Sequence, residues 1–163
     1  MVLPPPFTAY HGVVDSEYDA VVEKCVEAGV VEYTTEVPWA QCGLFGVAKS
    51  EDLARCVLEA RGANLCFETP EHTALPSSES LSKIAVPPGT QLRGALLDLD
   101  NYFHRLLLPV LYRKYFGLPA TSDGRQVRWR TMGMGWSWSV FFAQMAHQHV
   151  LSRQLCGFMP ALG

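Results

Sequence analysis

Two pairs of short β-prone segments, each joined across a polar turn, constrain the fold of this chain most. The first pair, residues 44–49 and 54–59, flanks the polar turn Ser50-Glu51-Asp52. The second pair, residues 114–118 and 126–131, flanks Asp123-Gly124. Segments of this length that flank such turns are typical of antiparallel hairpins. The sequence therefore predicts two β-hairpins, the first with a basic residue on each arm, Lys49 and Arg55.

Other segments have helical patterns. Residues 16–28 follow the capping residues Asp15-Ser16, repeat apolar side chains at helical spacing and end at Gly29, so they predict a helix. Residues 138–151 are apolar and lack Gly and Pro, which predicts a helix packed on the sheet. We also expect a short helix over 78–84 and helical structure in at least part of 101–112. The predicted fold class is α+β, an antiparallel sheet packed by helices.

Two further segments favour strands. Residues 30–35 are β-prone and are ended by Pro38. Residues 94–100 form an apolar run that ends in acids and is too short for a helix, so we expect a buried strand that carries Asp98 at its end. Asp100 would share a face of that strand with Asp98.

Composition limits the classes of protein that this chain can be. Its 163 residues, 48% of them hydrophobic and 18% charged, suit one domain or a piece of a larger one, with a core. The five cysteines are scattered and never spaced as C-x-x-C, which argues against a disulfide framework or a zinc site. We find no signal peptide and no apolar run of about 18 residues that would span a membrane. We therefore expect an intracellular protein without a membrane partner.

The charges are divided unevenly along the chain. Residues 1–100 carry six Lys/Arg and fifteen Asp/Glu, whereas residues 101–163 carry seven Lys/Arg and only Asp123. A locally positive region can bind nucleic acid through its phosphates even in a chain of net charge −3. The candidate residues for this are Arg105, Arg113, Lys114, Arg125, Arg128 and Arg130. The alternative is that these cations face the carboxylates of the first half within the fold.

Asp98 is the main candidate for chemistry. A carboxylate at the end of a buried strand is costly unless it is paired, hydrogen-bonded or bound to a metal such as Mg²⁺. If the first hairpin folds over it, Lys49 and Arg55 could hold a triphosphate whose metal Asp98 binds. The alternatives are a helix cap for Asp98 and a solvated surface for the two cations. In residues 133–139, two glycines permit close backbone approach, and the two tryptophans either stack on bases or lie in the core.

Four segments in this order resemble the fingers and palm of reverse transcriptases from retroelements. Residues 97–104 (LDLDNYFH) resemble the first palm motif, and residues 131–144 resemble the second in its hepadnavirus form. Residues 44–49 and 55–64 resemble the finger strands of that family. Each motif is short and weak alone, but the ordered set is fairly specific.

The resemblance implies a role for each matching residue. Asp98 would bind catalytic Mg²⁺ together with the carbonyl of Leu99, and Lys49 and Arg55 would contact the triphosphate of an incoming deoxynucleotide. Phe103 would exclude a 2′-hydroxyl. Residues near the nucleotide and template would be Met134 and Gly135, and Ser139 would start the following helix, while Arg61 and Asn64 would brace the finger strands. The implied reaction is RNA-directed DNA synthesis on a primed RNA or DNA template.

The resemblance also implies a division of the chain, and it has departures. Residues 1–15 would be a proline-rich lead-in, 16–92 a fingers-like region and 93–163 an N-terminal part of the palm, giving a partial right-hand polymerase fold. Gly133, Val140, Glu59 and Asn101 differ from the residues usual in the family. No aromatic-x-Asp-Asp hairpin follows Asp98, so we expect this polypeptide by itself not to polymerise DNA. The alternatives are a non-catalytic module that binds nucleic acid or protein, and an unrelated α+β domain.

Overall fold

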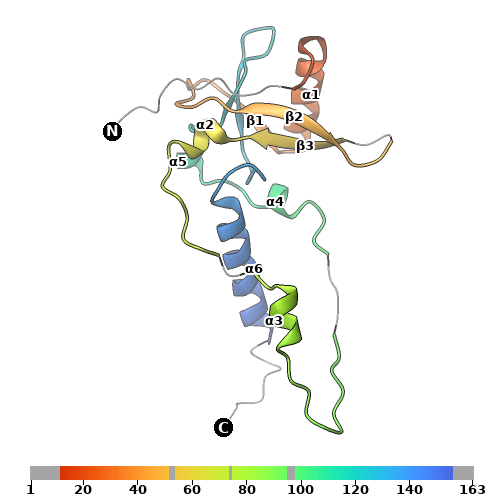
Figure 1. The fold of residues 1–163 in the computed structure, drawn as a ribbon. Helices are drawn as coiled ribbons and strands as arrows, with labels where there is room; N and C mark the ends of the chain where they lie inside the picture. The colour runs from red at the N-terminus through yellow and green to blue at the C-terminus, as the bar shows by residue number, and fades with distance from the viewer. Residues whose placement is uncertain (1–11, 52–53, 74, 95–97, 156–163) are drawn as a thin grey trace.

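The strands form two small antiparallel sheets in the computed structural model, which describes residues 12–51, 54–73, 75–94 and 98–155 (Figure 1). One sheet has the order β1–β5–β4, with bounds Val31–Thr34, Gln126–Trp129 and Gly117–Leu118. The other is the hairpin of β2 (Gly43–Ala48) and β3 (Ala54–Glu59). Both predicted hairpins are confirmed, although residues 114–116 lie outside the short strand β4. Residues 1–11 of the proline-rich lead-in lie outside the described residues.

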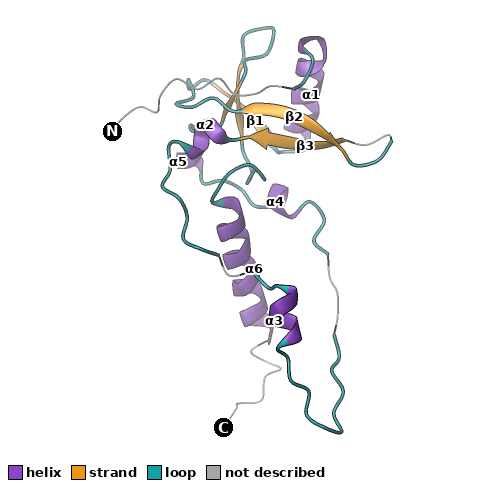
Figure 2. Cartoon of the chain, viewed as in Figure 1, coloured by secondary structure: helices purple, strands orange, loops and turns teal. Residues whose placement is uncertain are grey.

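The described part of the chain has six helices. They are α1 (Asp15–Glu27), α2 (Arg61–Asn64), α3 (Ser78–Ser82), α4 (Tyr102–Arg105), α5 (Val110–Arg113) and α6 (Ser139–Leu155). Of these, α3 and α6 extend away from the sheets (Figure 2). The predicted helices at the positions of α1, α3 and α6 are confirmed, whereas α2 was not predicted. The expected packing of the last helix on the sheet is wrong: α6 points away from both sheets (Figure 1), and Val150 and Leu151 near its end are exposed. No described helix is long and apolar enough to cross a membrane.

The predicted helical region over 101–112 is interrupted between α4 and α5, because the intervening backbone pairs with the chain that follows β5. The amide of Met132 donates to the carbonyl of Leu106 (2.8 Å), and the amide of Leu108 donates to that of Arg130 (2.9 Å). Pro109, which has no amide hydrogen, then precedes α5. This pairing holds α4 beside the first sheet.

The core is built from alternating strand residues and a cluster of aromatic rings. Val127 and Trp129 are buried on one face of β5, while Gln126 and Arg128, which alternate with them, are less buried, as the two-residue period of a strand requires. Phe67 lies against Phe116 and Trp136, with ring centroids 6.0 and 5.4 Å away. Trp136 is 3% exposed, so it belongs to the core rather than to a base-stacking surface.

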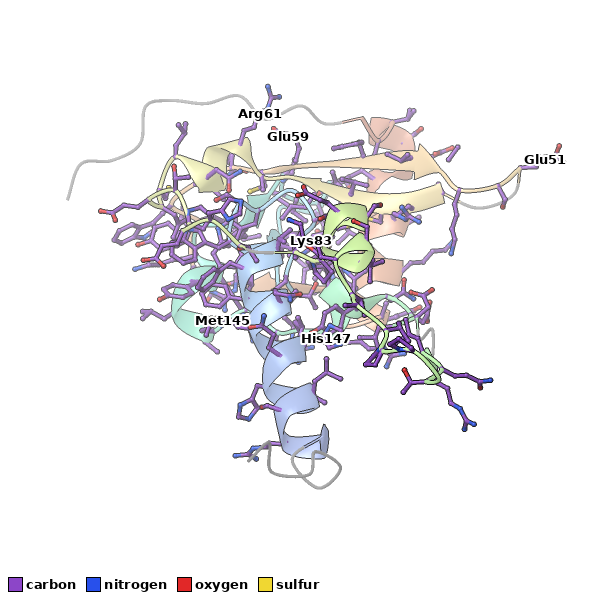
Figure 3. The ribbon with its side chains drawn as sticks, turned by 60° about the horizontal axis from the view of Figure 1, so that its bottom comes forward. Glu51, Glu59, Arg61, Lys83, Met145 and His147 are labelled. Atoms are coloured by element: carbon purple, nitrogen blue, oxygen red, sulfur yellow. The ribbon has the colours of Figure 1, made fainter. Side chains whose placement is uncertain are left out.

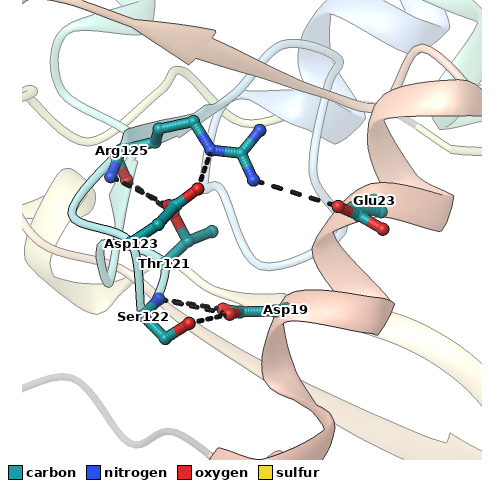
Figure 4. A network of polar contacts seen from close by, with 6 residues as sticks. All are labelled: Asp19, Glu23, Thr121, Ser122, Asp123 and Arg125. Carbon is teal, nitrogen blue, oxygen red and sulfur yellow. Dashed lines mark hydrogen bonds and ion pairs between the residues drawn. The ribbon is translucent and has the colours of Figure 1, made fainter.

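Polar contacts fasten α1 to the connection between β4 and β5 (Figure 4). The carboxylate of Asp19 accepts hydrogen bonds from the amide and hydroxyl of Ser122. Arg125 lies 2.7 Å from Asp123 and 3.9 Å from Glu23 on α1. The predicted turn at Asp123-Gly124 is confirmed by the positive φ of Gly124, 85°.

The predicted buried strand over 94–100 is wrong in its described part, since residues 95–97 lie outside the described residues. Gly94 and residues 98–100 are exposed and in no strand. The carboxylate of Asp100 accepts a hydrogen bond from the side chain of Asn101 (3.1 Å) and lies 3.9 Å from Arg105. A strand needs a neighbour for its backbone groups, and no described strand pairs here, so an apolar sequence alone does not create one.

Candidate functional site

The β2–β3 hairpin carries two cations toward the segment that contains Asp98. Arg55 pairs with Val47 in the ladder, and Lys49 follows the end of β2, so both side chains leave the same end of the hairpin. Both are exposed, and neither has a carboxylate within 4.0 Å among the described residues. Their charge is therefore available to a ligand.

Asp98 reaches this place through a sharp turn rather than a strand. Asn101 has a φ of 52°, the left-handed conformation that Asn tolerates better than most residues, and it directs the chain into α4. The hydroxyl of Tyr102 on α4 donates to the carbonyl of Ala143 on α6 (2.8 Å), and this hydrogen bond holds α4 against α6. Asn101, not Asp98, is the N-cap of α4, so the capping alternative for Asp98 is wrong.

A cavity of about 270 Å³ lies where these elements meet. Of the seven residues expected at a nucleotide or metal site, six line it: Lys49, Arg55, Asp98, Leu99, Phe103 and Met134. They come from the hairpin, the segment before α4, α4 itself and the loop before α6, and are up to 85 positions apart. The fold thus brings together side chains that the sequence keeps far apart.

Gly135 is the seventh of these residues, and it packs against the hairpin instead of lining the cavity. A Cβ at this position would lie 2.2 Å from the carbonyl oxygen of Leu58. The side chain of Asn64 on α2 makes two hydrogen bonds of 3.0 Å with the loop before α6. Its amide group donates to the carbonyl of Gly135, and its oxygen accepts from the amide of Ser137. The expected bracing role of Asn64 is consistent with these contacts, and the loop places Met134 at the cavity.

Three further contacts, made by Glu59, Ser139 and Trp138, stabilise the fold between the end of the hairpin and α6. Glu59 and Arg61 lie side by side where β3 meets α2 (Figure 3), with an ion pair of 2.8 Å. Ser139 begins α6, as expected, and its hydroxyl donates to the carbonyl of Gly133 (2.6 Å). The indole of Trp138 donates to the carbonyl of Glu68 (2.7 Å) and its ring stacks on Phe142. Both tryptophans of this segment are thus held by the fold.

The six cations expected to bind nucleic acid are mostly held within the chain. Glu32 lies 2.8 Å from Arg113, 2.6 Å from Arg128 and 3.8 Å from Arg130. Arg125 pairs with Asp123, Arg105 makes a long contact with Asp100, and Lys114 lies 3.8 Å above the ring of Trp39. The alternative in which these cations face carboxylates of the first half applies to the three arginines around Glu32 and, through Glu23 and Asp100, to Arg125 and Arg105.

Sequence reasoning assigned no role at the cavity to Asn101, Tyr102 and His104, which also line it. Their position next to Phe103 on α4 was the available signal, because one turn of helix brings neighbours to one site. Burial lowers the pKa of His104, so this side chain is uncharged at neutral pH. The positive charge at the cavity therefore comes from Lys49 and Arg55.

The described residues contain no group of three or more His, Cys, Asp or Glu side chains that could hold a metal ion by themselves. Asp98 and Asp100 each offer a carboxylate and Leu99 a backbone carbonyl, all hard oxygen donors that suit Mg²⁺. Because Mg²⁺ commonly binds through one or two carboxylates plus substrate phosphates, this donor set fits a metal that arrives with a nucleotide.

Comparison with known proteins bears on the fold. No protein-family model matches the chain, and no curated protein does. A solved structure of the foamy viral protease-reverse transcriptase dRH in complex with double-stranded DNA matches 93% of this chain with a TM-score of 0.58 and 18% identity. The chain therefore has a fold similar to that of a part of this protease-reverse transcriptase. It spans about a quarter, 26%, of the foamy viral chain, and at this identity the similarity concerns the fold alone.

Proposed function

We propose that this chain forms the nucleotide-binding part of a reverse transcriptase-like polymerase and binds a deoxynucleoside triphosphate with Mg²⁺ in the cavity beside α4. The observation that carries the proposal is the convergence of Lys49, Arg55 and Asp98 on one cavity. Asp100 lines the cavity as well, so two cations without an acidic partner among the described residues lie across from two carboxylates, which suits a ligand that is itself an anion bound to a cation.

Each lining side chain has a separate part in this proposal. Lys49 and Arg55 bind the phosphates, Arg55 through its planar guanidinium and Lys49 as a point charge. Phe103 packs under the sugar and leaves no room for a 2′-hydroxyl, and Met134 packs against the base. Asp98 and the carbonyl of Leu99 hold the metal, which when bound neutralises phosphate charge as a Lewis acid.

The foamy viral structure contains double-stranded DNA, which supports a primed duplex as the second partner of the polymerase. Phosphoryl transfer by two metal ions needs more carboxylates than Asp98 alone. The proposal for this chain is therefore tested by nucleotide binding, a measurement that does not require the complete catalytic site.

The test is isothermal titration calorimetry with dGTP in the presence of Mg²⁺, repeated with EDTA and with GTP. We expect binding that requires Mg²⁺ and favours dGTP. Asp98→Asn, Lys49→Gln and Arg55→Gln should each weaken it about 5- to 30-fold, since a charge-assisted contact contributes about 1–2 kcal/mol at an exposed site. Phe103→Ala should reduce the preference for dGTP over GTP.

The matched control is Arg153→Gln, which removes one positive charge from an exposed position on α6 remote from the cavity-lining residues. It should leave dGTP affinity unchanged. Absence of dGTP binding in the unmodified chain would overturn the proposal, and so would binding that Asp98→Asn and Lys49→Gln leave intact.

A further inference from the structure

A second cavity, of about 450 Å³, lies on the other side of the hairpin end, between α1, β3 and α4. Its lining includes three permanent cations: Lys24 from α1, Arg55 from β3 and Arg105 from α4. The cavity shares Arg55, Asn101 and His104 with the nucleotide cavity. Lys24 and Arg105 line the second cavity and not the first.

The described lining of this second cavity contains no carboxylate. Lys24 and Arg55 have no acidic partner within 4.0 Å in the described part of the chain. Arg105 lies 3.9 Å from the carboxylate of Asp100, which is largely exposed to water, and its Nε donates to the backbone carbonyl of Asp100 (2.9 Å), a neutral acceptor that leaves the charge of the guanidinium uncompensated. By contrast, the three arginines near the first sheet have acidic neighbours: Glu32 lies within 4.0 Å of Arg113, Arg128 and Arg130, and Glu36 also pairs with Arg128. Because the chain has a net charge of −3, the lack of carboxylates here is not explained by a shortage of acids.

Like charges that converge on one concave site repel one another, and a bound anion relieves that repulsion. The volume lies within the range of about 300–1,000 Å³ that small-molecule sites occupy. Two guanidinium groups and one ammonium suit phosphate oxygens, which accept bidentate hydrogen bonds from Arg and a point charge from Lys. A nucleic-acid strand brings one charge per phosphate, whereas a compact oligophosphate brings three or more to one place.

We propose that this cavity binds a free inorganic oligophosphate of the pyrophosphate class through Lys24, Arg55 and Arg105. Asn101 and the uncharged His104 supply neutral polar groups at the wall that the two cavities share. The inference does not require the proposed nucleotide function, because two of the three cations line this cavity alone. If both proposals hold, Arg55 serves adjoining sites for a nucleotide and for an oligophosphate.

The test is titration of the full chain with pyrophosphate in EDTA, so that no metal-dependent site contributes. We expect binding that Lys24→Gln and Arg105→Gln each weaken about tenfold. Both side chains are exposed, so the variants should keep the melting temperature of the unmodified chain. The charge control is again Arg153→Gln, which should have no effect.

The variant Asp98→Asn separates this proposal from the previous one. It should weaken Mg²⁺-dependent dGTP binding but leave pyrophosphate binding in EDTA unweakened. No pyrophosphate binding would overturn the inference, as would binding that depends on Lys49 but not on Lys24 and Arg105. An oligonucleotide that binds through Lys24 and Arg105 while pyrophosphate does not would also overturn it, because the ligand would then be a strand.

Discussion

Replacing Gly135 by alanine should disrupt the packing of the loop before α6 on the hairpin and so destabilise the fold. An added Cβ would lie 2.2 Å from the carbonyl oxygen of Leu58 and 3.3 Å from the amide of Ala60. Ordinary contact begins at 3.4 Å, so the loop must retreat by 1.2 Å, the difference between 3.4 and 2.2 Å. Both groups belong to the backbone of β3 and its end, which cannot rotate away as a side chain can.

This retreat would break the two hydrogen bonds that Asn64 makes with the loop, which are 3.0 Å each. Each loss costs about 1 kcal/mol, and overpacking adds about 1–3 kcal/mol, so we expect a loss of about 3–5 kcal/mol in the free energy of unfolding. A domain has about 5–15 kcal/mol in total, so the loss is a large fraction. Because Met134 precedes Gly135 and lines the nucleotide cavity, dGTP affinity should fall as well.

Urea unfolding followed by circular dichroism measures the change, with two glycines of the chain as controls. Gly94→Ala meets no described atom within 4 Å and should change stability by less than about 0.5 kcal/mol. Gly133→Ala meets the flexible Cδ2 of Leu58 at 2.5 Å and should be intermediate. If Gly135→Ala unfolds at the same urea concentration as Gly94→Ala, the close packing of the loop on β3 is refuted.

Three further predictions follow from contacts away from the cavity. Glu32→Gln should lower the free energy of unfolding by about 2–4 kcal/mol in urea titrations, since Arg113, only 11% exposed, would lose its carboxylate and Arg128, 13% exposed, would keep only the exposed Glu36. Glu79→Gln, in an exposed pair, should have little effect. In alkylation followed by mass spectrometry, Cys25 should react before Cys42. The reason is that a hydrogen bond from Cys56 lowers the pKa of Cys25, whereas burial raises the pKa of Cys42 to about 12. Equal alkylation rates would contradict this expectation. The hydrogen bond from Thr121 lowers the pKa of Asp123. The stability that this carboxylate contributes is therefore present above its unfolded-state pKa and is lost as the pH falls through its folded-state pKa. An NMR titration should show the lowered pKa of Asp123, and Thr121→Val should raise that pKa.

The elements that the sequence predicted correctly are those with local causes. The turn at Gly124 and the apolar repeat of α1 depend on residues within a few positions of one another, so backbone preference and side-chain period were sufficient. The predicted cap at Asp15-Ser16 is wrong, since the helix begins at Asp15 after Val14, without a side-chain cap. The strand expected over 94–100 failed because its cause is not local. Its apolar run indicated burial, but a strand exists only with a partner, and partners are chosen by the rest of the fold.

At the candidate site, too, the sequence predicted one part and the tertiary structure decided the other. The sequence by itself predicted which residues form the candidate site, since Lys49, Arg55 and Asp98 occur in short motifs whose order can be read along the chain. Only the tertiary structure decided that these side chains meet at one cavity, and that Lys24 joins Arg55 and Arg105 at another. The physical reason is that electrostatic neighbours are set by distance in space: Glu32 pairs with arginines from the far half of the chain, whereas Lys24, Lys49 and Arg55 have no carboxylate within 4.0 Å among the described residues.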